Sequence, residues 1–327
     1  MSEQELRSLV IGHQISQAVS VFAELGIADL LAEGTLTSDE LAASTSAHPR
    51  SLYRLLRALA TIDVVREEDG ERFSLARIGE LLRSDVPNSL RGWARYNGRP
   101  LMRDSWTALE HSIRTGENAF RHVHGTDVWS YRAERPEDSA VFDSAMQSIT
   151  SGVNDALARG YDFSRFSTVV DVGGGNGALL AGLLAHYREL NGVLFDQEHV
   201  VAGSGLVLEA VADRCRVVAG SFFEAVPDGG DAYVLKSIIH DWEDAESVDI
   251  LRVVRRTGGV VLLVERQLGA PNENLASKFS DLNMLVNPGG MERTADEYAA
   301  LFDAAGYRFV AETPIASGWA VFEGAPA

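Results

Sequence analysis

The sequence predicts an α/β protein in which a mostly helical N-terminal part precedes a doubly wound parallel sheet. From residue 168 onward, short β-branched segments alternate with helical segments, which is typical of a parallel sheet with helices on both faces. A glycine-rich turn joins the first of these strands to its helix. Residues 1–150 instead carry apolar residues at helical spacing.

The composition is that of a folded chain with an acidic surface. The 327 residues are 46% apolar and carry a net charge of -18, and this acidity opposes binding to nucleic acid. Cys215 is the sole cysteine, so an intramolecular disulfide and a Cys-rich metal site are excluded. The first residues lack a secretory pattern and no apolar run spans a bilayer. We therefore expect a cytoplasmic protein without a membrane partner.

Apolar spacing and end signals predict the N-terminal helices. Residues 16–31 have apolar side chains at close to a 3.6-residue period. Thr37 or Ser38 can cap a second helix, with Glu40 in its first turn. Pro49 opens a third helix, which carries a stripe of leucines.

A hairpin is predicted next, because segments 64–66 and 72–75 flank an acidic tip. Two helices followed by a hairpin form a winged-helix pattern, and such a domain often binds DNA. Arg50, Arg54 and Arg57 around the third helix favour this interpretation, whereas the acidic tip opposes it. The other interpretation is a dimerisation domain that also covers a substrate.

Alternating strands and helices continue to the C-terminus, where the last two strands pair as a hairpin and add an antiparallel strand to the sheet. The predicted strands are 168–171, 192–196, 216–219, 232–235, 259–265, 308–313 and 318–324, and the predicted helices are 177–190, 199–212, 243–256 and 294–305, the last capped by Thr294.

The glycine turn indicates a ligand. Gly173, Gly175 and Gly177 lie between a strand and a helix, where glycine permits a tight turn and close approach of a ligand. Asp196 ends the second strand, and a carboxylate there can accept the hydroxyls of a ribose. Asp171 would oppose a pyrophosphate but would suit a ligand with an ammonium and a sulfonium. We expect S-adenosylmethionine rather than a nicotinamide dinucleotide.

Four ordered motifs then identify a family resemblance over nearly the whole chain. They are DVGGGNG (171–177), the segment from GSFF to HDWED (220–244), Glu265 at the end of a strand, and NPGGMERT (287–294). With them the chain resembles the caffeate/acetylserotonin type of S-adenosylmethionine-dependent O-methyltransferases, which includes plant phenylpropanoid enzymes and bacterial natural-product tailoring enzymes.

The resemblance implies a Rossmann-like class I methyltransferase sheet and a winged-helix-like domain that forms a homodimer. We expect a dimerisation domain at 1–92, a helical acceptor-pocket region at 93–155 and a catalytic domain at 156–327.

The resemblance also implies a role for each candidate site residue. The cofactor-binding residues would be Asp171, Gly173, Gly175, Asp196, Ser221, Phe222, Lys236 and Trp242. Phe142, Met146 and Asn287 would line the acceptor pocket, and no metal is expected. Ser221 stands where the family often has Asp, which predicts weaker recognition of the adenine.

His240 would be the general base, held by Glu265 and Glu292. A hydroxyl attacks a sulfonium methyl group weakly unless its proton is removed, and histidine can take that proton. A neighbouring carboxylate orients the ring. We therefore predict an O-methyltransferase acting on a small, aromatic, hydroxylated metabolite. The alternatives are a homologue that binds S-adenosylmethionine for sensing or for other chemistry, a transcription regulator and a nicotinamide-dependent dehydrogenase.

Overall fold

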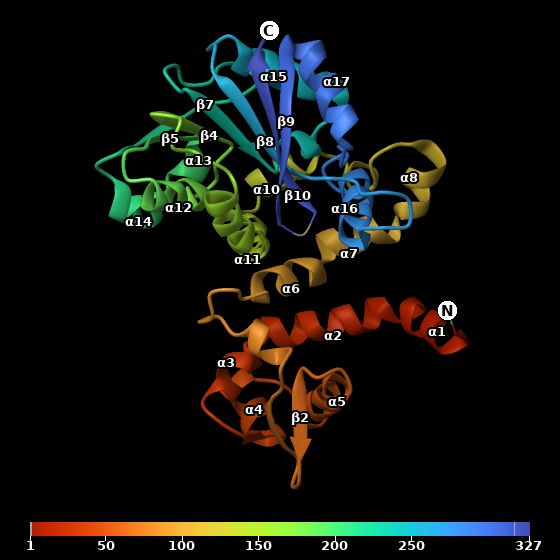
Figure 1. The fold of residues 1–327 in the computed structure, drawn as a ribbon. Coiled ribbons are helices and arrows are strands. Elements are labelled where there is room, and N and C mark those ends of the chain that lie inside the picture. Colours follow the sequence, from red (N-terminus) through yellow and green to blue (C-terminus); the bar gives the residue numbers. More distant parts are fainter. Residues whose placement is uncertain (1, 317) are drawn as a thin grey trace. The chain divides into compact units, whose positions relative to one another are not determined.

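The computed structural model describes residues 2–316 and 318–327, and it separates into two compact units (Figure 1). The N-terminal unit consists of residues up to Asp104 together with Arg132–Thr150. The C-terminal unit consists of Ser105–Tyr131 together with Ser151–Ala327. The helical region expected at 93–155 is thus divided between them. Among the described residues, no helix is long and apolar enough to cross a membrane.

Helices and a small antiparallel sheet of order β1-β3-β2 make up the N-terminal unit. Its elements are α1 (Glu3–Val10), α2 (Gly12–Glu24), α3 (Ile27–Ala32), β1 (Leu36–Thr37), α4 (Ser38–Thr45), α5 (Pro49–Ala60), β2 (Val65–Glu68), β3 (Arg72–Leu75), the 3-10 turn η1 (Gly79–Leu82) and α6 (Arg91–Gly98). Helices α7 (Pro100–Thr107), α10 (Val128–Ala133) and α11 (Pro136–Gly160) each contain residues of both units.

Two predicted helix starts, at Thr37 or Ser38 and at Pro49, are confirmed in this unit, whereas the helix predicted from residue 16 begins at Gly12. The Thr37 hydroxyl accepts the Glu40 amide while the Glu40 carboxylate accepts the Thr37 amide, so α4 begins with a reciprocal cap. Pro49 is the first residue of α5, where its missing N–H costs no hydrogen bond. Leu52 and Leu56 of α5 are buried in the core of the unit.

One predicted helix is wrong in its extent. Residues 16–31 form two helices rather than one, because α2 ends at Glu24 and α3 begins at Ile27. Gly26 lies between them with φ +66°, a left-handed conformation that glycine adopts without steric cost and that interrupts the helix. The apolar period continues across the break, so periodicity alone did not reveal it.

A seven-stranded sheet of order β6-β5-β4-β7-β8-β10-β9 forms the C-terminal unit. Its strands are β4 (Thr168–Val172), β5 (Asn191–Asp196), β6 (Cys215–Ala219), β7 (Ala232–Lys236), β8 (Val260–Arg266), β9 (Tyr307–Ala316) and β10 (Trp319–Pro326). Its other elements are α8 (Leu109–Thr115), α9 (Ala119–His124), α12 (Ala178–His186), α13 (Glu198–Val201), α14 (Gly205–Leu208), η2 (Glu209–Val211), η3 (Ile239–Asp241), α15 (Asp244–Arg255), α16 (Leu275–Val286) and α17 (Ala295–Ala305).

The sheet confirms the predicted class. Strands β4 to β8 are parallel, and β10 pairs antiparallel with both β8 and β9. Val169 and Val170 of β4 are fully buried in two different clusters, because successive side chains point to opposite faces of a sheet that is covered on both sides. Strand β8 lies next to β7, with Lys236 opposite Val264. This register places the carboxyl ends of β7 and β8 side by side.

Several segments of this unit differ from the prediction, and the helix predicted over 177–190 ends at His186. Residues 199–212, predicted as one helix, are divided among α13, α14 and η2. The segment contains Gly203 and Gly205, and glycine weakens a helix interior. No helix was predicted at α16, a 12-residue helix that carries residues of the site described below.

Candidate active site

The glycine turn connects β4 to α12 and hydrogen-bonds to the carboxyl end of the neighbouring strand β5. The Gly173 amide donates to the Phe195 carbonyl at 2.8 Å, and the Gly175 amide donates to Asp196 Oδ2 at 2.9 Å. Gly173 has φ +70°, and a Cβ there would lie 2.4 Å from Cδ1 of Ile238. The left-handed backbone favours glycine at this position, and the turn lies directly against Ile238 of the loop that follows β7.

Asp171 is a buried carboxylate beside this turn. It is 1% exposed, and its Oδ2 has no hydrogen-bond partner in the described structure. Burial raises its pKa to about 7, with Lys236 acting to lower the pKa and Asp196 to raise it. Burial also raises the pKa of Asp196. An unsatisfied buried acid is costly, and a cationic group nearby would favour its ionised form. The site therefore fits the ammonium and sulfonium of S-adenosylmethionine.

Aromatic side chains gather beyond the end of β6. The ring centroid of Trp242 lies 4.7 Å from that of Phe223 and 6.2 Å from that of Phe222, and both pairs are edge-on. The Trp129 ring stacks on Trp242 with a centroid distance of 6.3 Å. The Ser221 hydroxyl accepts the Phe223 amide at 3.3 Å. The cluster offers the flat apolar surfaces that an adenine needs.

His240 lies in η3, the turn after β7. Ser237 at its start has φ +56°, a conformation that turns the chain away from the strand direction. The Glu265 carboxylate at the end of β8 accepts the amides of Ile238 and Ile239 at 3.0 and 2.8 Å. Because β7 and β8 are neighbours, the acid on one strand fixes the loop on the other.

Three carboxylates surround the His240 ring. Its Nδ1 lies 3.1 Å from Glu292 Oε1 and 3.7 Å from Glu265 Oε2, and its Nε2 lies 3.6 Å from Asp241 Oδ1. The side chain is 12% exposed. Burial opposes protonation, but Glu292, Glu265 and Asp241 outweigh it and raise the pKa of His240 to about 10. The geometry stabilises an imidazolium and gives the ring a fixed direction.

The two glutamates differ in their surroundings. Burial raises the pKa of Glu265 to about 7 even though His240 lowers it. Burial also acts to raise the pKa of Glu292, but the His240 charge and hydrogen bonds from His240 and Ser280 lower it overall. The Ser280 hydroxyl donates to Glu292 Oε1 at 2.7 Å. Glu292 is therefore the principal anionic partner of the ring.

Ser280 was missed in the sequence analysis. It lies on α16, whose mixed polar and apolar sequence was not assigned to an element. The same helix carries Asp281, which accepts the Glu292 amide at 3.0 Å. The sequence signal for this helix is Asn274, which can cap a helix that begins at Leu275. The polar residues Ser280 and Asp281 on that helix could then have been paired with Glu292 in the NPGGMERT motif.

Ligand atoms of His240, Glu265 and Glu292 all lie within 4.8 Å of one another, a spacing that would also suit a metal ion. Hydrogen bonding and charge already account for the arrangement of the ring and Glu292. The absence of a metal therefore stays a prediction, which a chelator can test.

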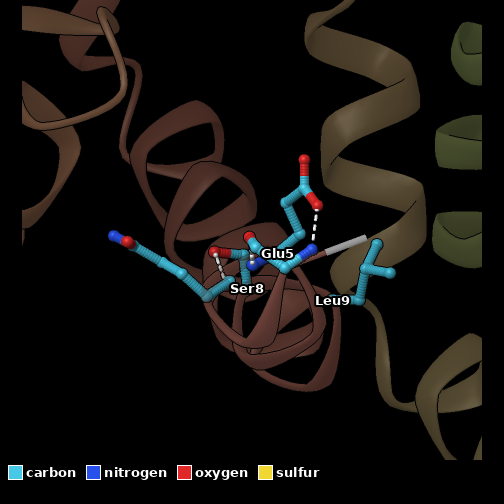
Figure 2. A pocket seen from close by; sticks show the side chains of 5 residues that line it. Glu5, Ser8 and Leu9 are labelled. Carbon is cyan, nitrogen blue, oxygen red and sulfur yellow. Dashed lines mark hydrogen bonds between the residues drawn. The ribbon is translucent and has the colours of Figure 1, made fainter.

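The predicted acceptor residues belong to different units. Asn287 in the C-terminal unit is 3% exposed, and its amide nitrogen donates to Asn283 Oδ1 at 2.7 Å. Phe142 and Met146 lie on the part of α11 that belongs to the N-terminal unit. Their place around an acceptor stays a prediction. Figure 2 shows a different hollow beside α1, where Glu5, Ser8 and Leu9 are labelled, and none of the predicted site residues lines it.

The comparisons with known proteins agree with this architecture. A family model of the O-methyltransferase domain matches residues 106–308, and one of the O-methyltransferase dimerisation domain matches residues 8–85. The chain is 41% identical to phenazine O-methyltransferase PhzM of Lysobacter antibioticus over 326 residues, which cover 98% of this chain and 95% of that protein.

Solved structures extend the likeness. The crystal structure of LaPhzM has a TM-score of 0.95 at 40% identity and covers 99% of both chains. That of NcsB1, an O-methyltransferase from neocarzinostatin biosynthesis in complex with S-adenosylmethionine and 2-hydroxy-5-methyl naphthoic acid, has a TM-score of 0.84 at 34% identity and covers 96% of both chains.

Fold and site together define a class I methyltransferase with a Rossmann-like sheet and an N-terminal dimerisation domain. The chain belongs to the O-methyltransferase family of the caffeate/acetylserotonin type, and it is an S-adenosylmethionine-dependent enzyme.

Proposed function

We propose that this enzyme methylates a hydroxyl group of a small aromatic metabolite and that His240 is its general base. The observation that carries the proposal is the His240 ring, held through Nδ1 by Glu292 and Glu265 at the carboxyl edge of the sheet. The Gly173 turn touches the same loop through Ile238. The base and the cofactor turn are therefore adjacent.

The chain's residues can each perform one part of the reaction. Asp171, Asp196 and Trp242 would hold the cofactor, which supplies a methyl group on a cationic sulfur that leaves as a neutral thioether. His240 would take the acceptor's proton, which leaves its oxygen free to attack the methyl carbon. Glu292 would stabilise the resulting imidazolium. Glu292, Glu265 and Asp241 raise the pKa of His240 to about 10, so the ring must first be in its neutral form, which a bound cationic cofactor favours, before it can take the proton of the acceptor.

An aromatic acceptor is supported by the names of similar proteins, which act on a phenazine or are seen with a naphthoic acid. A phenol is also a better acceptor than an aliphatic alcohol for this base, because its pKa lies closer to that of His240.

His240→Ala tests the base. We expect cofactor affinity, measured by calorimetry with S-adenosylhomocysteine, to stay within about twofold while turnover falls by about 10²–10⁴-fold, the usual contribution of a general base. His186→Ala, at the exposed end of α12, is the matched control. Full turnover in His240→Ala would remove His240 as the base, and loss of activity on adding a chelator would indicate a metal.

We further propose a homodimer formed through the N-terminal helices. Leu6, Leu9 and Val10 of α1 are 55%, 64% and 67% exposed, and α1 buries none of its residues. Ile11 and Ile15 continue the exposed apolar surface into α2. This surface overlaps the segment that matches the dimerisation domain, and its burial against a second copy would remove it from water.

A further inference from the structure

The backbone of the His240 turn is held from a second side by a buried arginine. Arg293 is 1% exposed, and its Nη1 donates to the Ile239 carbonyl at 3.1 Å while its Nη2 donates to the Trp242 carbonyl at 2.9 Å. These two carbonyls flank His240 along the chain. Ser247 adds weaker hydrogen bonds to the same two carbonyls at 3.4 Å.

Arg293 is itself fixed at both edges of its guanidinium group. Its Nε and Nη2 donate to Asp244 Oδ1 at 3.0 and 2.8 Å, and its Nη1 also reaches the Met291 carbonyl at 3.3 Å. Asp244 is the first residue of α15. A planar group with several fixed donors can hold two carbonyls in one geometry, which a lysine ammonium cannot do.

Neighbouring residues of the same segment hold the ring. Glu292 binds His240 Nδ1, and Arg293 binds the carbonyls on either side of His240. Gly290 packs so closely against the turn that a Cβ would lie 2.2 Å from the His240 carbonyl oxygen. Within the segment 290–293, Gly290 and Arg293 therefore contact the backbone around His240, and Glu292 contacts its side chain.

We propose that Arg293 is a positioning residue, which sets the direction of the His240 ring by holding the carbonyl groups of Ile239 and Trp242. The inference rests on the proposed role of His240. Arg293 touches neither cofactor nor acceptor in this scheme. Its effect on turnover comes from the alignment of His240 Nε2 with the acceptor hydroxyl, because a misplacement of about 1 Å can cost about 10²-fold in rate.

The alternative is that Arg293 only stabilises the fold, and Arg214 provides the matched control. Arg214 lies in the same unit and also donates to three backbone carbonyls, those of Tyr187 at 3.2 Å, Leu190 at 2.8 Å and Leu184 at 2.9 Å. It holds the end of α12 and contributes no contact to the His240 turn. Its replacement measures what the loss of such hydrogen bonds costs in stability alone.

The experiment compares Arg293→Lys with Arg214→Lys in the full-length enzyme. Thermal melting, affinity for S-adenosylhomocysteine, kcat and KM are measured, and the His240 ring signal is titrated by NMR with nitrogen-labelled histidine. We expect both variants to melt at lower temperature. Arg293→Lys alone is expected to lower kcat by roughly 10- to 100-fold and to shift the His240 titration, with cofactor affinity within about twofold.

An Arg293→Lys enzyme that matches Arg214→Lys in kcat and in the His240 titration would overturn the proposal. Should Arg293→Lys fail to fold, Asp244→Asn loosens the arginine without removing it, and it is expected to lower kcat less strongly. Unchanged kcat and an unchanged ring signal in Asp244→Asn would likewise count against Arg293. The His240 ring signal distinguishes a failure of the Arg293 proposal from a failure of the proposal that His240 is the base. It reports the surroundings of the ring even if His240→Ala shows that another group is the base.

Discussion

At the scale of single residues, charge around His240 decides which protonation state its ring holds. Glu292, Glu265 and Asp241 raise the pKa of His240 to about 10 from 6.5. Because the folded pKa is above the unfolded one, the imidazolium's contribution to stability is complete below about pH 6.5 and is lost as the pH rises through about 10. A bound cationic cofactor would lower the pKa of His240 again and so increase the fraction of neutral ring, the form that can accept a proton, at neutral pH.

Glu292→Gln tests this electrostatic account. Removing the anion nearest Nδ1 is expected to lower the pKa of His240, so the rising limb of the pH-rate profile moves to lower pH. The NMR titration of the ring is expected to move in the same direction. Glu243→Gln, an exposed acid just before α15, is the control and should leave both unchanged. A limb that stays in place in Glu292→Gln would mean that another group titrates.

Ser221→Asp tests the adenine contact. The serine hydroxyl already accepts the Phe223 amide, and a carboxylate there could also accept the adenine amino group. Charge-assisted hydrogen bonds are about twice as strong as neutral ones, so we expect tighter binding of S-adenosylhomocysteine by calorimetry. Ser221→Ala should bind no more tightly than the wild type. No gain in Ser221→Asp would reject the hypothesis that serine weakens adenine recognition.

Sequence reasoning found the residues whose chemistry is visible in a motif. Asp171 was predicted from its place before the glycine turn, whereas the roles of His240 and Glu265 came from the family resemblance, and the structure brings His240 and Glu265 together. Arg293 and Ser280 were missed, because they bind backbone or a neighbouring acid rather than a ligand. Such supporting contacts depend on packing between segments far apart in the chain.

At the scale of elements, the segment 287–293 is a loop whose close packing fixes the base. Gly290→Ala tests this, because the new Cβ would lie 2.2 Å from the His240 carbonyl oxygen and would force the two segments apart. We expect lower thermal stability and a loss of most turnover. Gly182→Ala in α12, where a Cβ would meet nothing within 4 Å, should instead stabilise by up to about 1 kcal/mol.

Near-normal kcat in a folded Gly290→Ala enzyme would contradict this packing argument. Circular dichroism melts and steady-state kinetics on both glycine variants give the comparison, and the Gly182 variant shows whether the assay detects a benign glycine substitution.

Elements were predictable where local signals were strong. The reciprocal cap at Thr37 and the β-branched strands β4 and β8 carry their own signals, and they are confirmed. The break at Gly26 and the division of 199–212 were not predicted. In both segments the apolar spacing favours a continuous helix, whereas the glycines favour an interruption. Helix α16 was not predicted, because its capping residue Asn274 was not recognised as the start of a helix. In the structure the Asn274 side chain accepts the Ser277 amide.

At the scale of the whole molecule, the proposed homodimer would bury the exposed apolar surface of α1. Leu9→Glu and Val10→Glu together place two charges on this surface and should yield a monomer, because an unpaired buried charge is costly at an interface. Light scattering coupled to size exclusion gives the mass. Ser8→Glu adds a charge to the same helix outside the apolar stripe and should remain dimeric. A monomeric wild type, or a dimeric double variant, would refute the proposed interface.

The proposed reaction transfers a methyl group from S-adenosylmethionine to an aromatic hydroxyl, with His240 as the base. The most direct measurement incubates the purified enzyme with cofactor labelled in its methyl group and with a panel of phenols, polyketides and phenazines, and analyses the products by mass spectrometry. We expect a labelled methyl group on an aromatic oxygen with the wild type and almost none with His240→Ala. Cofactor binding without any labelled product, or equal labelling by both enzymes, would contradict it.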